Sequence, residues 1–366
     1  MKIAWRELTR KPSRFLTAGG ALTLLTVLLL LLGGLLDGLY LSATAAIRAQ
    51  SAQVVVYSAD SRDSLLRSRI DPATSQQIAE VDGVQSVSGF GVALLGARVP
   101  GQSDLADVSV FGYEAANAQV PAPLPTGQAY ADESLKASGI ALGQTVWVGP
   151  ARTPVTVEGW VSDTAYLFQG GLWANEETWR TVLNENRPDA ALPPGTWQVA
   201  LVDTHGNADP ARVASAIESQ VPEVSALTKE EAIAALPGVK EQASTFTSII
   251  GTTFVVAGLV VALFFALLTL ERIGLFGVLK AIGAGSRTLA AGLVLQAFAI
   301  SAGAFVLGTV LTIGMAAVIP PEVPVQLLPR RALITAVGLI ITALVGSAIS
   351  FRRIIRIDPA SAVGGS

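Results

Sequence analysis

Four apolar stretches of this sequence are each long enough to cross a lipid bilayer. They cover residues 15–42, 244–270, 289–319 and 332–351. A bilayer core of about 30 Å needs about 20 helical residues. The 201 residues between the first and second stretch, 43–243, have an ordinary soluble composition. We therefore expect a membrane α-helical fold with four transmembrane helices, one before and three after a large domain.

The distribution of charge predicts how these helices are oriented. The three short flanks (residues 1–14, 271–288 and 352–366) carry 11 basic and 3 acidic residues in total. The region 43–243 carries 12 basic and 23 acidic residues, a net charge of −11. Short basic flanks stay in the cytoplasm. We therefore predict a multi-pass protein of the cytoplasmic membrane with both termini inside and the large domain extracytoplasmic.

Two further readings concern the ends of the chain. Residues 1–14 alternate apolar and basic positions at helical spacing and include Trp5, which favours an amphipathic helix on the inner membrane surface. The small residues Ala43 and Ala45 allow a cleaved signal peptide instead, but the apolar run before them is nearly twice the usual length. Residues 320–331 are expected to form a short outer loop and 352–366 a cytoplasmic tail.

The large domain is expected to be α/β with an inserted β-rich subdomain. Residues 73–95 read as helix, turn and strand, and residues 208–228 repeat that order. These segments predict two halves of a split α/β unit, about 50–103 and 203–236. The segment 104–202 is punctuated by Pro and Gly and is rich in short strand patterns. Within it, residues 127–140 are expected to form a short helix.

Several chemistries find no support in the sequence. The chain has no cysteine and one histidine, His205, which lies in a polar turn-like segment, so no metal site is expected from the protein alone. Neither a G-x-S-x-G elbow nor a G-x-x-x-x-G-K-[ST] phosphate loop occurs. We expect no catalysis, no nucleotide site and no nucleic-acid partner in this chain. Any nucleotide energy must come from another polypeptide.

Some residues in the predicted spans stand out. Gly33, Gly34 and Gly38 lie near the end of the first span and predict close helix packing or a dimer contact. Asp37 is costly in a span unless it reaches water, a partner or a ligand. Tyr40 shares its face and is either functional or an interfacial aromatic residue.

The segment between the second and third spans, 271–285, combines charge with glycine. Glu271, Arg272 and Lys280 flank apolar positions at helical spacing, and Gly283 and Gly285 are stop signals. One reading is an amphipathic helix that docks into a groove of a partner. The other is a reverse turn whose glycines allow tight packing. Spacing alone does not decide between them.

Three motifs favour the docking helix over the reverse turn, because they resemble motifs of a known family. The segment "ERIGLFGVLKAIGAGSRTL" resembles the cytoplasmic segment of the MacB/FtsX-like permeases of ABC transporters. The opening "AWRELTRKPSRFLT" is similar to that family's amphipathic helix, and "RRIIRIDPASAV" is similar to its closing basic run. The arrangement of one plus three spans around a large outer domain is also the family's.

The resemblance implies a homodimeric permease with a separate ABC ATPase subunit on each copy, two per complex, surrounded by membrane lipid. ATP and Mg²⁺ would be bound by the ATPase, and no cofactor by this chain. Nucleotide-driven closure of the ATPases would move a coupling helix and, through stiff spans, the outer domain. The implied coupling residues are Glu271, Arg272, Gly274, Lys280, Ala281, Ile282, Gly283 and Ala284.

The stretch "VVVYSADSRDSLLRSRID" is similar to haem-efflux permeases of the HrtB type and to DevC-type exporter permeases. This similarity favours haem as the exported substrate. Export of a lipid, peptide or antibiotic stays open, as does an FtsX-like role that regulates an outer hydrolase without transport. Met315 could ligate haem or fill an apolar gap, and Arg330 and Arg331 could meet propionates or lipid phosphates. The residues considered for a haem path are Asp37, Tyr40, Glu241, Met315, Arg330 and Arg331.

Overall fold

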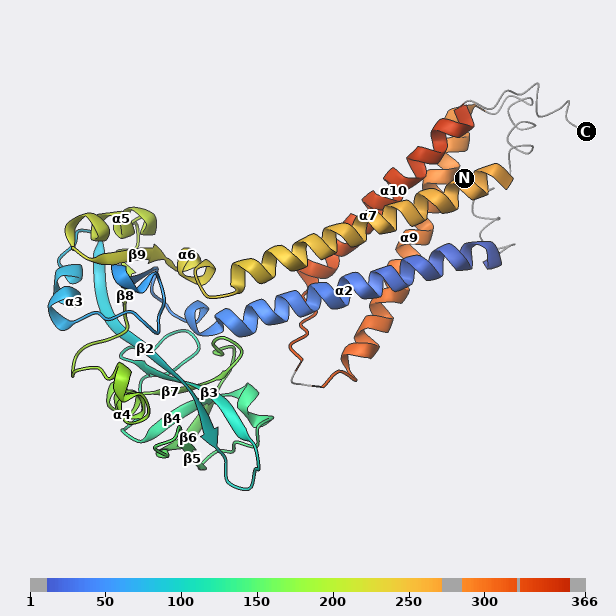
Figure 1. Ribbon diagram of the computed structural model, residues 1–366. Helices are drawn as coiled ribbons and strands as arrows, with labels where there is room; N and C mark the ends of the chain where they lie inside the picture. The colour runs from blue at the N-terminus through green and yellow to red at the C-terminus, as the bar shows by residue number, and fades with distance from the viewer. Residues whose placement is uncertain (1–11, 272–284, 321–322, 356–366) are drawn as a thin grey trace, which may run out of the picture. The chain divides into compact units, whose positions relative to one another are not determined.

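The computed structural model describes residues 12–271, 285–320 and 323–355 (Figure 1). The chain divides into two compact units. We call residues 1–38 with 243–366 the helical unit, and residues 39–242 the sheet domain. Both boundaries between the units fall inside a helix, because α2 covers Pro12–Arg48 and α7 covers Val239–Glu271.

Four long helices supply the helical unit, as the sequence predicts. They are α2, α7, α9 (Ser286–Ala316) and α10 (Pro329–Ile355), and each contains a segment apolar and long enough to cross a membrane. Helix α2 continues six residues beyond the predicted span 15–42. Its last turns, including Ala43, Ala46 and Ile47, are buried in the sheet domain. Helix α10 begins at Pro329, within the predicted outer loop 320–331.

Small residues bring these helices together. Gly308 of α9 faces Thr26 of α2, where an added Cβ would come within 2.7 Å of the threonine side chain. Gly346 of α10 faces the Gly258 carbonyl of α7 at the same separation. Such contacts let helix backbones approach closely, which is how spans associate without a hydrophobic driving force between them.

A nine-stranded sheet forms the centre of the sheet domain, in the order β3-β7-β4-β6-β5-β2-β8-β1-β9. The strands are β1 (Val54–Ser58), β2 (Val84–Arg98), β3 (Leu105–Tyr113), β4 (Gln128–Asp132), β5 (Thr145–Val148), β6 (Thr153–Val161), β7 (Gly170–Ala174), β8 (Val199–Thr204) and β9 (Val224–Thr228). The helices are α3 (Pro72–Ala79), α4 (Glu176–Asn186), α5 (Pro210–Gln220) and α6 (Lys229–Ala234), with short 3₁₀ turns at Ala59–Ser61, Glu133–Lys136 and Pro188–Ala190.

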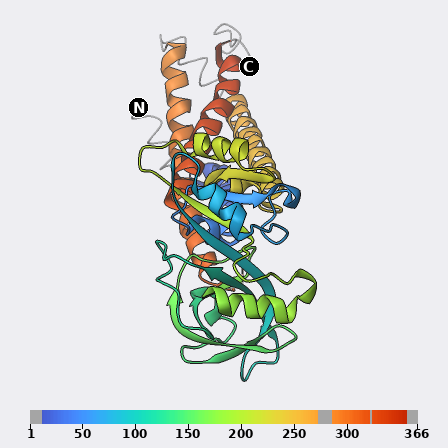
Figure 2. The ribbon, with the colours of Figure 1, turned by 90° about the vertical axis from the view of Figure 1, so that its left-hand side faces the viewer.

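Strand β2 belongs to two substructures (Figure 1). Its second half pairs with both β3 and β5, so the strands β3-β7-β4-β6-β5-β2 close into a barrel, seen at the bottom of Figure 2. Its first half pairs with β8, and β1 then lies between β8 and β9. The expected boundary at 103/104 therefore differs from the structure, because a 15-residue strand of about 50 Å serves both parts.

Apolar clusters cover both faces of the β8-β1-β9 extension. Helices α3 and α5 cover one face through Ile78, Val213 and Ile217. The end of α2 and helix α6 cover the other. A further cluster includes barrel residues and Trp179 of α4, whose ring lies against Gly91 and Gly112, where any Cβ would overlap it.

The short helix expected over residues 127–140 is wrong. Residues 128–132 form β4, which pairs with β6 and β7, and residues 133–136 form one 3₁₀ turn. Ladder hydrogen bonds on both sides of β4 outweigh the local helix preference of this segment.

Candidate functional site

The predicted docking segment after α7 lies mostly outside the described residues. Glu271 is the last residue of α7, and α9 begins after Gly285. The role of the segment therefore stays a prediction. The other predicted coupling residues fall in the undescribed range 272–284: Arg272, Gly274, Lys280, Ala281, Ile282, Gly283 and Ala284.

Two predicted substrate candidates meet directly in the helical unit. Asp37 lies on α2 and Arg331 in the first turn of α10. Arg331 Nε donates to Asp37 Oδ2 at 2.9 Å, and Nη2 donates to Oδ1. The side chains are 14% exposed for Asp37 and 28% for Arg331. A bidentate pair of this kind satisfies both charges within a span, where either alone would be costly.

Beside this pair, the segment that leads into α10, together with the first three residues of α10, rests on the glycines of α2. We call residues 323–331 the strap. Gln326 N donates to the Gly34 carbonyl at 2.9 Å. The Arg331 side chain lies against Gly33, and the Pro324 carbonyl lies so close to Gly38 that a Cβ there would overlap it. The strap therefore packs on Gly33, Gly34 and Gly38 of the same chain.

A small cavity of about 160 Å³ adjoins the strap. Its lining is mainly apolar and comprises Leu30, Thr309, Thr312, Ile313, Leu327, Leu328, Pro329, Arg331 and Ala332. Ligand pockets for drug-sized molecules occupy about 300–1,000 Å³. The cavity is therefore too small to enclose a macrocycle.

The remaining candidate residues are more exposed than Asp37 and Arg331. Met315 is 48% exposed near the end of α9, and Arg330 is exposed at the start of α10. Tyr40 is 39% exposed on α2, and Glu241 is exposed in the first turn of α7. Across residues 12–271, 285–320 and 323–355, no three His, Asp or Glu side chains converge as a metal site would require.

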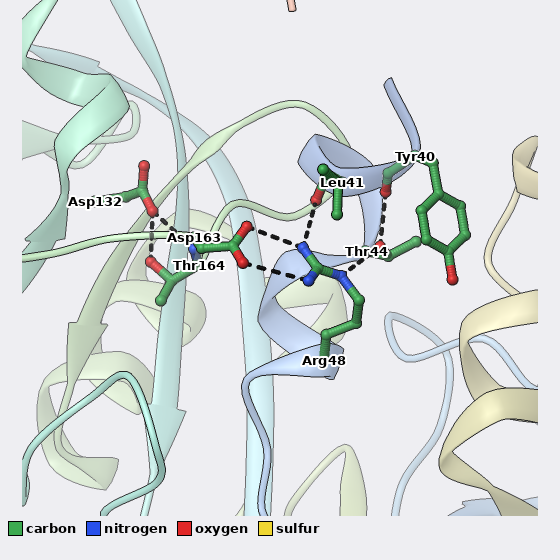
Figure 3. A network of polar contacts seen from close by, with 7 residues as sticks. All are labelled: Tyr40, Leu41, Thr44, Arg48, Asp132, Asp163 and Thr164. Atoms are coloured by element: carbon green, nitrogen blue, oxygen red, sulfur yellow. Dashed lines mark hydrogen bonds and ion pairs between the residues drawn. The ribbon is translucent and has the colours of Figure 1, made fainter. Parts of the chain in front are cut away.

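The end of α2 is held in the sheet domain by a polar network that the sequence did not reveal (Figure 3). Arg48 donates to Asp163 through Nη2 at 2.9 Å and Nη1 at 3.3 Å. Its Nε donates to Thr44 Oγ1 at 3.1 Å, and Nη2 reaches the Leu41 carbonyl at 3.3 Å. Since Asp163 follows β6, the network ties α2 to the loop between β6 and β7.

Asp132 braces the same loop from the end of β4 (Figure 3). Its Oδ2 accepts from Thr164 N at 2.9 Å and from Thr164 Oγ1 at 2.6 Å. Its Oδ1 accepts from Ser134 N at 2.9 Å. The residue is 4% exposed, so these hydrogen bonds replace the water that a buried carboxylate would otherwise need.

Backbone contacts complete this attachment, which we call the α2 joint (residues 41–48 and 162–169). Ala46 N donates to Ala165 O at 2.9 Å, whereas a regular helix would direct that N–H to the Ser42 carbonyl. Leu167 N donates to Ala43 O at 3.1 Å and Phe168 N to Ser42 O at 3.4 Å. The loop is thus bonded into the helix ladder. Burial raises the pKa of the neighbouring Tyr166 phenol.

Some known proteins resemble this chain over its whole length, and others over about a third of it. Residues 247–359 match the FtsX-like permease C-terminal family. A proposed hemin transport system permease protein, HrtB, of Staphylococcus epidermidis is 20% identical over 367 aligned positions, covering 100% of this chain and 99% of the relative. An uncharacterised ABC transporter permease of Mycobacterium tuberculosis is 38% identical over 115 residues, 31% of this chain and 32% of the relative.

Two solved structures are similar to part of the chain. The periplasmic region of MacB from Actinobacillus actinomycetemcomitans has a TM-score of 0.35 at 14% identity, covering 50% of this chain and 92% of that one. The extracellular domain of the ABC-type transporter YknZ from Gram-positive bacteria has a TM-score of 0.35 at 13% identity, covering 48% and 100%.

Proposed function

The chain belongs to the MacB/FtsX-like family of ABC transporter permeases, and we propose that it is the permease subunit of a haem exporter. Membership of this family implies a partner ATPase. In the proposed complex, two copies of this chain each bind one ATPase through residues 271–285. Both termini face the cytoplasm and the sheet domain faces outward, in line with the basic flanks and the net charge of −11 over residues 43–243.

The observation that carries the proposed mechanism is the continuity of two helices. The boundary 38/39 falls inside α2 and the boundary 242/243 falls inside α7. The boundary in α2 lies well inside that helix, whereas the boundary in α7 lies in its first turn, directly after the turn at residues 235–238. We infer that movement imposed on the helical unit by the ATPases reaches the sheet domain through these two helices.

In the proposed mechanism, the α2 joint is the place where movement of α2 passes into the sheet domain. Ala46 and Ile47 are fully buried in the sheet-domain core, so the helix end cannot slide without repacking that core. Arg48 and the three backbone hydrogen bonds to the β6–β7 loop add directional attachment. Axial or rotational displacement of α2 would therefore move the sheet domain as a body.

Haem as the substrate is supported by the relative that matches along the whole chain, a proposed hemin transport permease. Haem is flat and apolar with two carboxylates at one edge, so it partitions into a bilayer. The 160 Å³ cavity beside the strap is too small for it. We infer that the haem path is a surface completed by the second copy, to which the exposed Met315 and Arg330 of the helical unit contribute.

Haemin titration of the purified chain with its ATPase in nanodiscs tests the proposal. Export predicts a shift of the Soret band on binding, stimulation of ATP hydrolysis by haemin, and haemin tolerance in cells that express both subunits. ATP turnover that responds to an outer protein but not to haemin would favour the regulatory alternative. Stimulation by a lipid, peptide or antibiotic alone would assign the exporter another substrate.

A further inference from the structure

The cavity beside the strap lies among three of the membrane-spanning helices. Its lining comes from α2, α9, the strap and the first turn of α10, so every wall belongs to the helical unit. Its volume of about 160 Å³ is close to that of an engineered apolar cavity of about 150 Å³ that stays dry and binds benzene. A space of this size can take a slender apolar group.

The polar side chains that line the cavity already have partners within the chain. Thr309 and Thr312 each donate to the carbonyl four residues earlier in α9, at 2.8 Å. The Arg331 guanidinium is paired with Asp37. A buried water typically makes about three hydrogen bonds to groups that are otherwise unsatisfied. The lining therefore suits an apolar occupant better than water.

The cavity lies at membrane depth, as the helical unit alone shows. The fourth apolar span, Pro329–Ser347, has 19 residues, or about 28 Å at 1.5 Å per residue, which matches a hydrocarbon core of about 30 Å. Its first turn, with Arg331, therefore marks one surface of that core. Leu30 lines the cavity from α2 and precedes Asp37, the partner of Arg331, by seven residues, or about 10 Å. The cavity thus extends from the surface of the core toward its centre.

The cavity opens on the surface of the helical unit. Ile313, Leu327 and Leu328 line it and are nevertheless 58%, 38% and 37% exposed. Side chains that are both lining and exposed form a mouth, and at this depth the surrounding medium is lipid. An empty apolar space forfeits the van der Waals contacts of its lining, and an acyl chain that enters restores them.

A positive charge without a partner lies next to the cavity in the chain. Arg330 stands between the lining residues Pro329 and Arg331 and is exposed. Its side chain forms no hydrogen bond or ion pair with any residue in the described ranges, whereas Arg331 is held by Asp37. Basic side chains at a membrane surface attract anionic lipid head groups. A phosphate at Arg330 and an acyl chain in the cavity would belong to one ligand.

We propose that the cavity binds the end of one acyl chain of an anionic phospholipid whose phosphate meets Arg330. The bound chain fills the space among α2, α9 and the strap and so supports their packing. Arg330 also belongs to the proposed haem path, so the lipid occupies the site when haem is absent. The lipid site itself holds whichever substrate the permease exports.

Photolabelling of the full-length chain in nanodiscs, without haemin or the ATPase, tests this site. The nanodiscs contain phosphatidylglycerol with a diazirine near the end of one acyl chain, and mass spectrometry locates the adducts. Ala332→Phe places a ring in the cavity, so we expect labelling of Leu30, relative to the exposed Val337, to fall at least fivefold. Ala317→Phe is the matched control at an exposed position that does not line the cavity, and it should label as the parent chain does.

Three results would overturn the site. Labelling of Leu30 that Ala332→Phe leaves unchanged would show that no acyl chain enters the cavity. Equal labelling of Leu30 by phosphatidylcholine with the same chain, or a preference for phosphatidylglycerol that survives Arg330→Gln, would remove the contact between the anionic head group and Arg330. Should Ala332→Phe misfold, benzoylphenylalanine in place of Leu328 must form a lipid adduct on irradiation, and a crosslink to the second copy would instead assign the cavity to a subunit interface.

Discussion

Asp37 and Arg331 are separated by 294 positions in the chain and meet inside the helical unit. The carboxylate and the guanidinium pair in bidentate geometry, and both side chains are mostly buried. In such a site the loss of one partner costs more than the loss of both, because the remaining charge is left without compensation. The pair therefore fixes how the strap sits on α2.

A double-mutant cycle measures this interaction. We expect Asp37→Asn and Arg331→Gln each to lower the free energy of unfolding in micelles, and the double variant to lose about 1–2 kcal/mol less than the sum of the single losses. Partial exposure of Arg331 keeps the coupling below that of a fully buried pair. Strictly additive losses would mean that the pair contributes nothing beyond its separate side chains.

Glycine at position 38 is required by the strap rather than by helix flexibility. Gly38→Ala places a Cβ on the Pro324 carbonyl, so the strap must shift, and we expect a loss of about 1–3 kcal/mol in unfolding free energy. Gly314→Ala in α9 is the matched control, since a Cβ there meets nothing within 4 Å. Alanine's higher helix propensity should leave that variant unchanged or slightly more stable. Equal effects of the two substitutions would argue against the strap contact.

At the scale of elements, two carboxylates hold the β6–β7 loop in different environments. Asp132 is buried and accepts hydrogen bonds from Thr164 and Ser134, whereas Asp163 is half exposed and pairs with Arg48. Asp132→Ala leaves the buried Thr164 N–H and hydroxyl without their acceptor. We expect it to cost about 2–4 kcal/mol, from several lost hydrogen bonds to a charged group.

Asp163→Ala is the control on the same loop. The exposed ion pair contributes less than about 1 kcal/mol, so global stability should hardly change. Hydrogen exchange of the amides in residues 42–46 should nevertheless accelerate, because the loop is bonded into the α2 ladder there. Unchanged exchange at those amides would show that Arg48 and Asp163 do not stabilise the α2 joint.

The elements that sequence predicted well are those whose signal is local. Four apolar runs of sufficient length led to four long helices, and the helix–turn–strand pattern of residues 73–95 coincides with α3 and β2. Closure of the barrel depends on β2 pairing with both β3 and β5, which no local pattern encodes. For the same reason residues 128–132 read as helix although their pairing partners make them a strand.

The candidate residues show the same difference between local signals, which the sequence reveals, and long-range contacts, which it does not. Asp37 and Arg331 were recognisable because charges are rare in apolar runs, but their pairing with each other is a long-range contact. Arg48 and Asp163, 115 positions apart, gave no signal in a domain with many charges. The turn at Leu167 and Phe168 was hidden because neither residue is a usual turn former at positive φ.

At the scale of the whole molecule, the proposed linkage can be interrupted where α2 passes from one unit to the other. Leu39→Pro removes a backbone donor within the helix, and its ring clashes with the carbonyl of Leu35, so α2 should kink there. We expect the variant to bind haemin as before. Haemin should then stimulate ATP hydrolysis by the partner subunit at least tenfold less than in the parent chain.

Leu39→Ala, which keeps the helix, is the control and should retain full stimulation. Hydrogen exchange in β1 and β8 serves as the folding check, because those strands lie in the core that receives the end of α2. Their protection must match the parent chain for the comparison to hold. Since α2 and α7 both cross between the units, a kinked α2 leaves α7 as a second connection. Full stimulation in Leu39→Pro would therefore assign the transmitting role to α7 and remove α2 from the mechanism.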